Sequence, residues 1–184
     1  MIGINDVARP RGDIRFELGS GKNFNRSFVE LSAPVAELIG DRLGSDAATN
    51  IALIRQTMCQ VLDGLPAPAS QLEAMHRLLL RHACDADITL DLHCDFEAAI
   101  HLYALPQHWP QWQSLAARLK AGVALLCEDS GGSSFDESCS TPWLRLARAF
   151  PEAAIPPANL ATTLELGSMG DLSLIHISEP TRPY

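Results

Sequence analysis

Short apolar segments alternate along this chain with longer segments whose apolar residues recur every three or four positions. Residues 88–93 read ITLDLH and residues 123–128 read VALLCE, a pattern typical of strands buried in a sheet. Residues 45–62 and 69–84 have the helical period. Further strands are predicted at residues 100–105 and 161–166, and further helices at residues 32–41, 110–121 and 141–150. This alternation predicts the α/β class with a mainly parallel or mixed sheet.

The remaining segments read as loops. Residues 1–31 are rich in Gly, Asn and Arg, with one short strand expected near residues 13–18. Residues 129–140 are rich in Ser and Gly and predict a surface loop, after which Pro142 would occupy the first turn of the helix at residues 141–150. Ser32 is expected to cap the helix at residues 32–41.

Composition narrows the class of protein. The 184 residues are 47% hydrophobic, which is enough for one domain with a sizeable core. No uninterrupted apolar run long enough to span a membrane occurs, and the first residues lack the pattern of a secretory signal. Fourteen basic against 22 acidic residues argue against a nucleic-acid partner, because phosphate contacts need clustered Lys and Arg.

The cysteines point to a reducing compartment. There are five of them, an odd number, and no pair has the C-x-x-C spacing. This usage favours reduced thiols in a cytoplasmic protein over a disulfide framework. The five are Cys59, Cys84, Cys94, Cys127 and Cys139.

The C-terminal residues differ in origin from the rest. Residues 172–182 read LSLIHISEPTR, which matches the in-frame translation of a transposase sequencing adapter, codon for codon. We interpret residues 172–184 as a non-native, adapter-derived tail and exclude them from reasoning about the fold. The alternative is a natural polar tail. On our interpretation residues 1–171 are native, and the natural protein would continue beyond Asp171.

Three short islands place polar or ionisable residues at the ends of apolar segments. They are GKNFNRSF at residues 21–28, TLDLHCDF at residues 89–96 and TTLELG at residues 162–167. A fourth, DIRF, lies upstream at residues 13–16. In α/β enzymes such positions form the active site.

In their order and approximate spacing, these islands resemble the succinylglutamate desuccinylase and aspartoacylase family, which belongs to the wider zinc carboxypeptidase fold. The resemblance covers residue 3 to about residue 171. It implies a mixed, mostly parallel sheet flanked by helices, truncated at both ends, so that residues 1–171 form a partial catalytic domain. It also implies a zinc-dependent amidohydrolase, a deacylase that cleaves an N-acyl amide of a small carboxylate-bearing substrate through a zinc-activated water.

The resemblance assigns roles on the two strand-end islands. His93 matches a zinc ligand of the family, and neutral imidazole suits zinc. Asp91 lies two residues earlier, on the same face of a strand, and could orient the imidazole. Glu165 matches the family's catalytic glutamate, a general base and then general acid. From the residues alone, His93 could equally be a hydrogen-bonding core histidine and Glu165 an outward-facing strand residue.

The resemblance also assigns substrate-binding residues. Arg26 and Asn25 match the family's N-R pair, in which the arginine offers a rigid fork to a substrate carboxylate. Arg15 matches a further arginine that binds substrate or polarises the scissile carbonyl, although Arg9 and Arg11 lie close by. Without the resemblance all three would be residues of an ordinary surface loop.

The other histidines are weaker candidates. His76 and His82 fall on a predicted helix and are expected at the surface. His101 lies on a predicted strand beside Tyr103 and could line the pocket.

One part of the family pattern is missing. The first two zinc ligands of the family lie in an H-x-x-E motif upstream, but no histidine precedes His76. Truncation at the N-terminus would explain this, and the alternative is a pseudoenzyme that has lost its metal. A truncated chain is expected to bind zinc weakly, to be inactive, and to expose strand edges that promote aggregation.

The partners follow from the same resemblance. We expect one zinc ion and a small-molecule carboxylate substrate, with neither nucleic acid nor membrane; the sequence gives no oligomeric state. A carboxypeptidase acting on peptides would share the zinc and carboxylate chemistry, and a metal-free binding protein is the alternative from another class.

Overall fold

The structure of the protein is a computed structural model that describes residues 15–17, 19–95 and 97–168. The chain divides into two compact units. A helical unit comprises residues 1–89 and 129–160, and a sheet unit comprises residues 90–128 and 161–184, each as far as the structure describes them. The tail at residues 172–184 lies outside the described residues, as does part of the strand predicted near residues 13–18.

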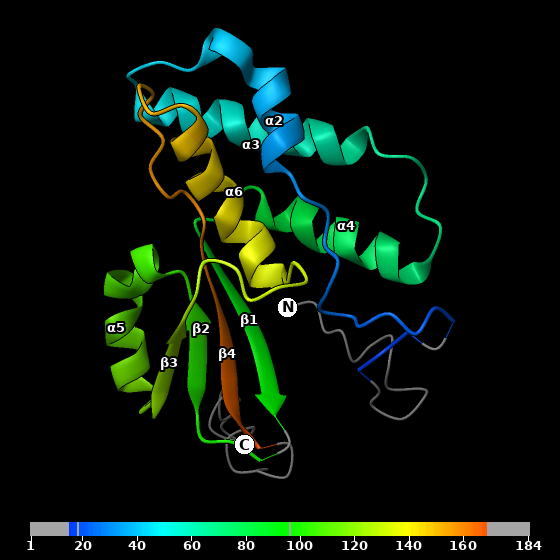
Figure 1. The fold of residues 1–184 in the computed structure, drawn as a ribbon, viewed down its shortest axis with the longest axis vertical. Helices are drawn as coiled ribbons and strands as arrows, with labels where there is room; N and C mark the ends of the chain where they lie inside the picture. The colour runs from blue at the N-terminus through cyan, green and yellow to red at the C-terminus, as the bar shows by residue number, and fades with distance from the viewer. Residues whose placement is uncertain (1–14, 18, 96, 169–184) are drawn as a thin grey trace, which may run out of the picture. The chain divides into compact units, whose positions relative to one another are not determined.

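The described part of the helical unit contains four α-helices that pack side by side (Figure 1). They are α2 (Ser32–Ile39), which leads into the 3-10 turn η2 (Gly40–Arg42), α3 (Ala47–Asp63), α4 (Gln71–Ala83) and α6 (Phe135–Ala149). Their shared core is apolar and includes Val35, Ile54, Met58, Leu62, Leu72, Leu80, Trp143 and Leu146. Among the described residues, no helix has the length and apolarity needed to cross a membrane.

Side-chain caps begin two of these helices. The Asp46 carboxylate accepts a hydrogen bond from the Thr49 amide at 2.7 Å, immediately before α3. Ser70 accepts from the Glu73 amide at 3.2 Å, and the Glu73 carboxylate accepts from the Ala69 amide at 2.8 Å. Ser70 thus pairs one amide that helix geometry leaves open at the start of α4, and Glu73 pairs the amide of the residue before the cap. The observed α3 and α4 confirm the predicted helices at residues 45–62 and 69–84.

The start of α2 differs from the prediction. Ser32 is the first residue of the helix and is not its cap, and the Glu30 carboxylate accepts from the amides of Ser32 at 2.8 Å and Ala33 at 3.1 Å. A glutamate two residues upstream is long enough to reach both amides. Its negative charge also suits the positive end of the helix dipole.

The prediction of a loop over residues 129–140 is wrong for its second half. Helix α6 begins at Phe135, and Pro142 lies inside it, away from its first turn. Asp136 and Glu137 occupy the first turn, where negative charge favours a helix start. Proline cannot donate a backbone hydrogen bond inside a helix, and α6 nevertheless continues through Pro142 to Ala149.

Within the residues that the structure describes, the sheet has four strands in the order β1-β4-β2-β3. They are β1 (Ile88–Asp95), β2 (His101–Ala104), β3 (Val123–Leu126) and β4 (Leu160–Ser168). β2 runs parallel to β3 and antiparallel to β4, and β1 and β4 run in the same direction (Figure 1). A 3-10 turn, η3 (Pro106–His108), leads into α5 (Trp109–Arg118), which packs against β2. The predicted α/β class with a mixed, mostly parallel sheet is confirmed.

Strand β4 occupies the interior of the sheet although it comes last among the strands. Ala161, Thr162 and Leu164 are each at most 3% exposed. The register of β4 against β2 pairs Glu165 with His101 and Thr163 with Tyr103. Because paired residues of antiparallel strands point to the same face, these four side chains share one face of the sheet.

The cysteines differ in their surroundings. Cys84 and Cys139 are buried in the helical unit, where Cys59 is half-buried, whereas Cys94 and Cys127 are exposed on the sheet unit. Burial, together with the neighbouring Cys59 thiol, raises the pKa of Cys84 to about 12. No disulfide joins any of the five.

Strand β1 turns an apolar row toward solvent. Ile88, Leu90 and Leu92 alternate with more polar residues and are 58%, 45% and 52% exposed. β1 also lies at the end of the strand order, with β4 as its one neighbour in the described sheet. A strand with unpaired backbone groups and exposed leucines is a template for pairing with another chain.

We therefore expect this chain to self-associate through β1, and Leu92→Lys to reduce the association. Sedimentation velocity over a range of concentrations measures the effect. Leu78 is 50% exposed on α4. Leu78→Lys is therefore the matched control: it makes the same substitution at an exposed site outside β1 and should leave the association unchanged. A parent chain that stays monomeric at every concentration would contradict the expectation.

Candidate active site

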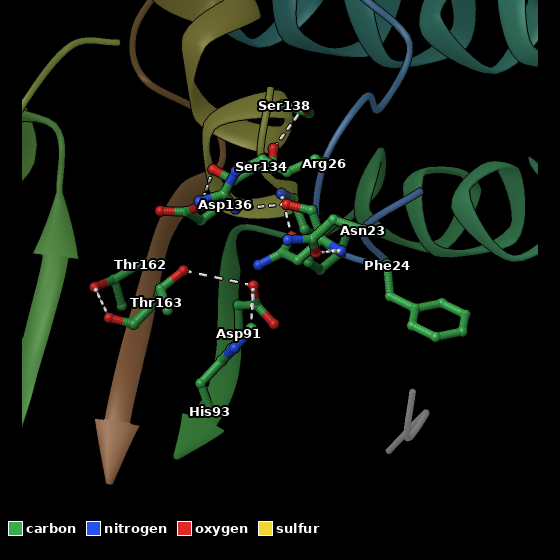
Figure 2. Close-up of polar contacts among 12 residues, drawn as sticks. Asn23, Phe24, Arg26, Asp91, His93, Ser134, Asp136, Ser138, Thr162 and Thr163 are labelled. Atoms are coloured by element: carbon green, nitrogen blue, oxygen red, sulfur yellow. Dashed lines mark hydrogen bonds and ion pairs between the residues drawn. The ribbon is translucent and has the colours of Figure 1, made fainter. Parts of the chain in front are cut away.

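One face of β1 brings an aspartate and a histidine into contact. The Oδ2 atom of Asp91 lies 2.9 Å from Nε2 of His93, and both side chains project from the same face of the strand (Figure 2). In neutral imidazole one ring nitrogen carries the proton and the other the lone pair. A Nε2–H that donates to Asp91 therefore places the lone pair of His93 on Nδ1.

Strand β4 adds to the same face. The Thr163 hydroxyl lies 3.5 Å from Oδ2 of Asp91, a long hydrogen bond between β4 and β1 (Figure 2). Glu165 stands two residues further along β4 and so points the same way. We call this set of side chains the polar sheet face; its members are Asp91, His93, His101, Tyr103, Thr163 and Glu165.

Glu165 is the most unusual member of the polar sheet face. Its side chain is half-buried, and within the described residues its Oε2 atom is buried without a hydrogen-bond partner. Burial raises the pKa of Glu165, because desolvation disfavours the charged form, while the nearby His93 and His101 act in the opposite sense. A raised pKa brings a carboxyl group closer to the range in which general acid–base catalysis is most effective.

The described residues offer a metal ion one ligand and not a complete site. Over residues 15–17, 19–95 and 97–168, no three or more His, Cys, Asp or Glu side chains are arranged to hold a metal ion. The imidazole of His93 is a suitable single ligand for zinc. The described part of this chain therefore offers one donor and a neighbouring carboxyl group, and does not by itself form a complete zinc site.

Asn25 has a structural contact that its sequence does not reveal. Its Oδ1 atom accepts a hydrogen bond from the backbone amide of Phe135 at 2.9 Å. Phe135 is the first residue of α6, and no side-chain hydrogen bond from Ser134 caps that helix. Asn25 therefore satisfies an otherwise unpaired amide at the start of α6.

Arg26 is held beside Asn25 in the helical unit. Its Nη1 atom donates to the backbone oxygen of Asn25 at 2.6 Å, and its side chain is half-buried. Among the residues that the structure describes, no carboxylate forms an ion pair with Arg26. A cation in this state can accept a carboxylate from outside the chain.

Arg15 lies in the same small turn structure. The Phe24 amide donates to the Arg15 backbone oxygen at 3.1 Å, and Phe16 pairs with Asn23 in an antiparallel bridge. The structure thus brings Arg15, Asn25 and Arg26 together in the helical unit, as it brings Asp91, His93 and Glu165 together in the sheet unit. The competing candidates Arg9 and Arg11 lie outside the described residues.

His76 is buried, contrary to the expectation of a surface residue, while His82 is exposed as expected. The Nε2 atom of His76 lies 2.7 Å from the Phe24 backbone oxygen, and its ring stacks on Phe28 with centroids 3.9 Å apart. Burial lowers the pKa of His76. His76 therefore supports, as a neutral ring, the segment that bears Asn25 and Arg26.

Together these features define a class: a mixed α/β protein in which a histidine and a desolvated carboxyl group share one face of the sheet. Scans against models of protein families and against the curated proteins find no match. Solved structures do match. A protein from Shewanella amazonensis SB2B, assigned to the succinylglutamate desuccinylase/aspartoacylase family, has a TM-score of 0.71 and 27% identity over 85% of this chain.

A second such protein, from Shewanella frigidimarina NCIMB 400, has a TM-score of 0.70 and 24% identity over 89% of this chain, a likeness of fold. The likeness to the first of these structures confirms the resemblance to the desuccinylase/aspartoacylase family read from the sequence, and the second supports the fold. The chain spans 44% and 45% of the lengths of the two neighbours.

The cap on α6 predicts the effect of changing Asn25. Asn25→Ala should lower the free energy of unfolding by about 1 kcal/mol, the usual cost of losing such a cap, measured by urea denaturation. Asn25→Asp keeps an accepting oxygen and should retain most of the stability. Equal loss in both variants would contradict the capping contact.

The burial of His76 predicts a pH dependence of stability. Because its pKa is lowered in the folded state, the unfolded chain binds a proton that the folded chain resists. The free energy of unfolding should then fall as the pH drops below about 6.5, the ordinary pKa of histidine. His76→Gln should flatten this fall, and His82→Gln, on the same helix, should not. Chemical denaturation at several pH values tests the pair, and identical profiles would contradict the prediction.

Proposed function

We propose that this chain is part of a zinc-dependent amidohydrolase, a deacylase that cleaves an N-acyl amide of a small carboxylate-bearing substrate. The observation that carries the proposal is the half-buried Glu165, with its raised pKa and unpartnered Oε2, on the same face as the Asp91–His93 pair. The likeness to desuccinylase/aspartoacylase family structures supports the reaction class.

In this proposal His93 is one zinc ligand and Asp91 its positioning partner. The Asp91 carboxylate would accept a hydrogen bond from Nε2–H, which would orient the ring and leave the Nδ1 lone pair for the metal. Zinc, when bound, supplies a water of lowered pKa and polarises a carbonyl oxygen. No H-x-x-E motif precedes His93 in the chain, so we propose that the remaining ligands come from the rest of a longer protein. The present chain alone would then bind zinc weakly and lack activity.

In this proposal Glu165 transfers a proton from the attacking water to the leaving amine. Its carboxylate accepts a proton from the attacking water and then delivers it to the nitrogen of the leaving amine. Both steps need a group whose pKa lies close to the working pH. Desolvation on β4 raises the pKa of Glu165 in that direction.

Arg26 and Arg15 would bind the substrate carboxylate. A guanidinium group forms two parallel hydrogen bonds with a carboxylate, and Arg26 has no ion-pair partner among the described carboxylates. Asn25 adds support to Arg26 through its backbone oxygen. We propose a cytoplasmic protein with reduced thiols and a small-molecule partner, with neither nucleic acid nor membrane.

The longer protein is the material for testing the proposal. Glu165→Gln should reduce kcat by about 10²–10⁴-fold on N-acyl amino acids, the range usual for loss of a general base, while zinc content stays unchanged. His93→Ala should lose zinc, as measured by atomic absorption. Glutamine preserves the shape of Glu165, so this pair separates proton transfer from metal binding.

Two outcomes would overturn the proposal. Turnover of peptides with none of N-acyl amino acids would favour a carboxypeptidase. An upstream reading frame that stays open without an H-x-x-E motif would favour a metal-free binding protein.

A further inference from the structure

The Gly-rich loop before α6 is fastened to the segment that bears Arg26. The Gly132 backbone oxygen accepts from the Ser27 amide at 2.7 Å, and the Ser133 oxygen accepts from the Phe28 amide at 3.2 Å. Asn25 completes the connection through the Phe135 amide. Residues 25–28 and 132–135 are therefore joined by hydrogen bonds on both sides of Arg26.

Gly132 lies directly against the Arg26 side chain. A Cβ atom at Gly132 would stand 2.8 Å from Cδ and 3.3 Å from Nε of Arg26, closer than carbon atoms approach without strain. Gly131 has the same φ of +85°, but a Cβ atom there would meet nothing within 4 Å. Two adjacent glycines thus share a backbone conformation and differ in what they touch.

We propose that Gly132 is a positioning residue for Arg26: its bare Cα lets the arginine stem lie on the loop, which aims the guanidinium group at a small anionic carboxylate. This inference rests on the proposed function. The stem is held by the loop on one side, and the guanidinium is held by the Asn25 backbone oxygen at 2.6 Å. A methyl group at Gly132 would displace Cδ, and the guanidinium beyond it moves with the stem.

The consequence for binding follows from geometry. A bidentate pair needs two parallel hydrogen bonds, and displacement of reacting or binding groups by about 1 Å is enough to cost up to 10²-fold. The loss should appear in KM, because Arg26 holds a part of the substrate remote from the transferred proton. Uniform binding of that kind changes KM and leaves kcat unchanged.

The experiment compares Gly132→Ala, Gly131→Ala and Arg26→Ala in the longer protein. Kinetics on an N-acyl amino acid give KM and kcat, competition by succinate gives carboxylate affinity, and thermal denaturation gives stability. Both alanines require φ near +85°, so both should lower Tm, and Gly132→Ala, which also displaces the Arg26 side chain, should lower it further. Gly132→Ala should raise KM about tenfold with kcat within about twofold, and Gly131→Ala should leave both near the parent values.

The outcomes separate this inference from the proposed function. If Arg26→Ala leaves KM and succinate affinity unchanged, the assigned role of Arg26 fails. If Arg26→Ala weakens both and Gly132→Ala does not differ from Gly131→Ala, the positioning role of Gly132 is overturned. Should Gly132→Ala fail to fold, the double variant Gly132→Ala/Arg26→Ala removes the clash and should fold like Gly131→Ala. A double variant that also fails to fold would overturn the inference.

Discussion

The sheet unit depends on the interior position of β4. Because β4 has a neighbouring strand on each side, its side chains are screened from water along most of its length. Its register against β2 places Glu165 opposite His101, and its other neighbour, β1, supplies Asp91 and His93. A glutamate on an exposed strand would keep its hydration and an ordinary pKa. The chemistry proposed for Glu165 is thus a direct result of the order of the strands.

The helical unit depends in a comparable way on contacts between distant segments. The Asn25 amide group caps a helix that begins 110 residues later in the chain. Its backbone oxygen at the same time holds the guanidinium of Arg26. One residue therefore connects the arginine to the start of the helix, and His76 contacts the same segment at the Phe24 backbone oxygen. Asn25 therefore serves both the start of α6 and the substrate binding proposed for Arg26.

Local patterns in the sequence were sufficient to predict most of the helices and strands. The periodicity of residues 45–62 and 69–84 and the four apolar strand segments correspond to α3, α4 and β1 to β4. The start of α6 could not be read locally, because its cap comes from Asn25. His76 had a usable signal, since it lies four residues from both Leu72 and Leu80 and so on the buried stripe of α4. No local sequence pattern predicts the register that pairs Glu165 with His101, because it is a tertiary contact. The same holds for the contact of Gly132 with Arg26.

Because the cysteines differ in burial, the rates at which their thiols are alkylated depend on different openings of the fold. A buried thiol with a pKa near 12, such as Cys84, is expected to react with an alkylating reagent mainly when the helical unit opens. Cys94 and Cys127 are accessible in the folded sheet unit and react without such opening. Timed alkylation followed by mass spectrometry would therefore measure the opening of the helical unit. The exposed thiols of the sheet unit would give the reference rate of alkylation in the same sample.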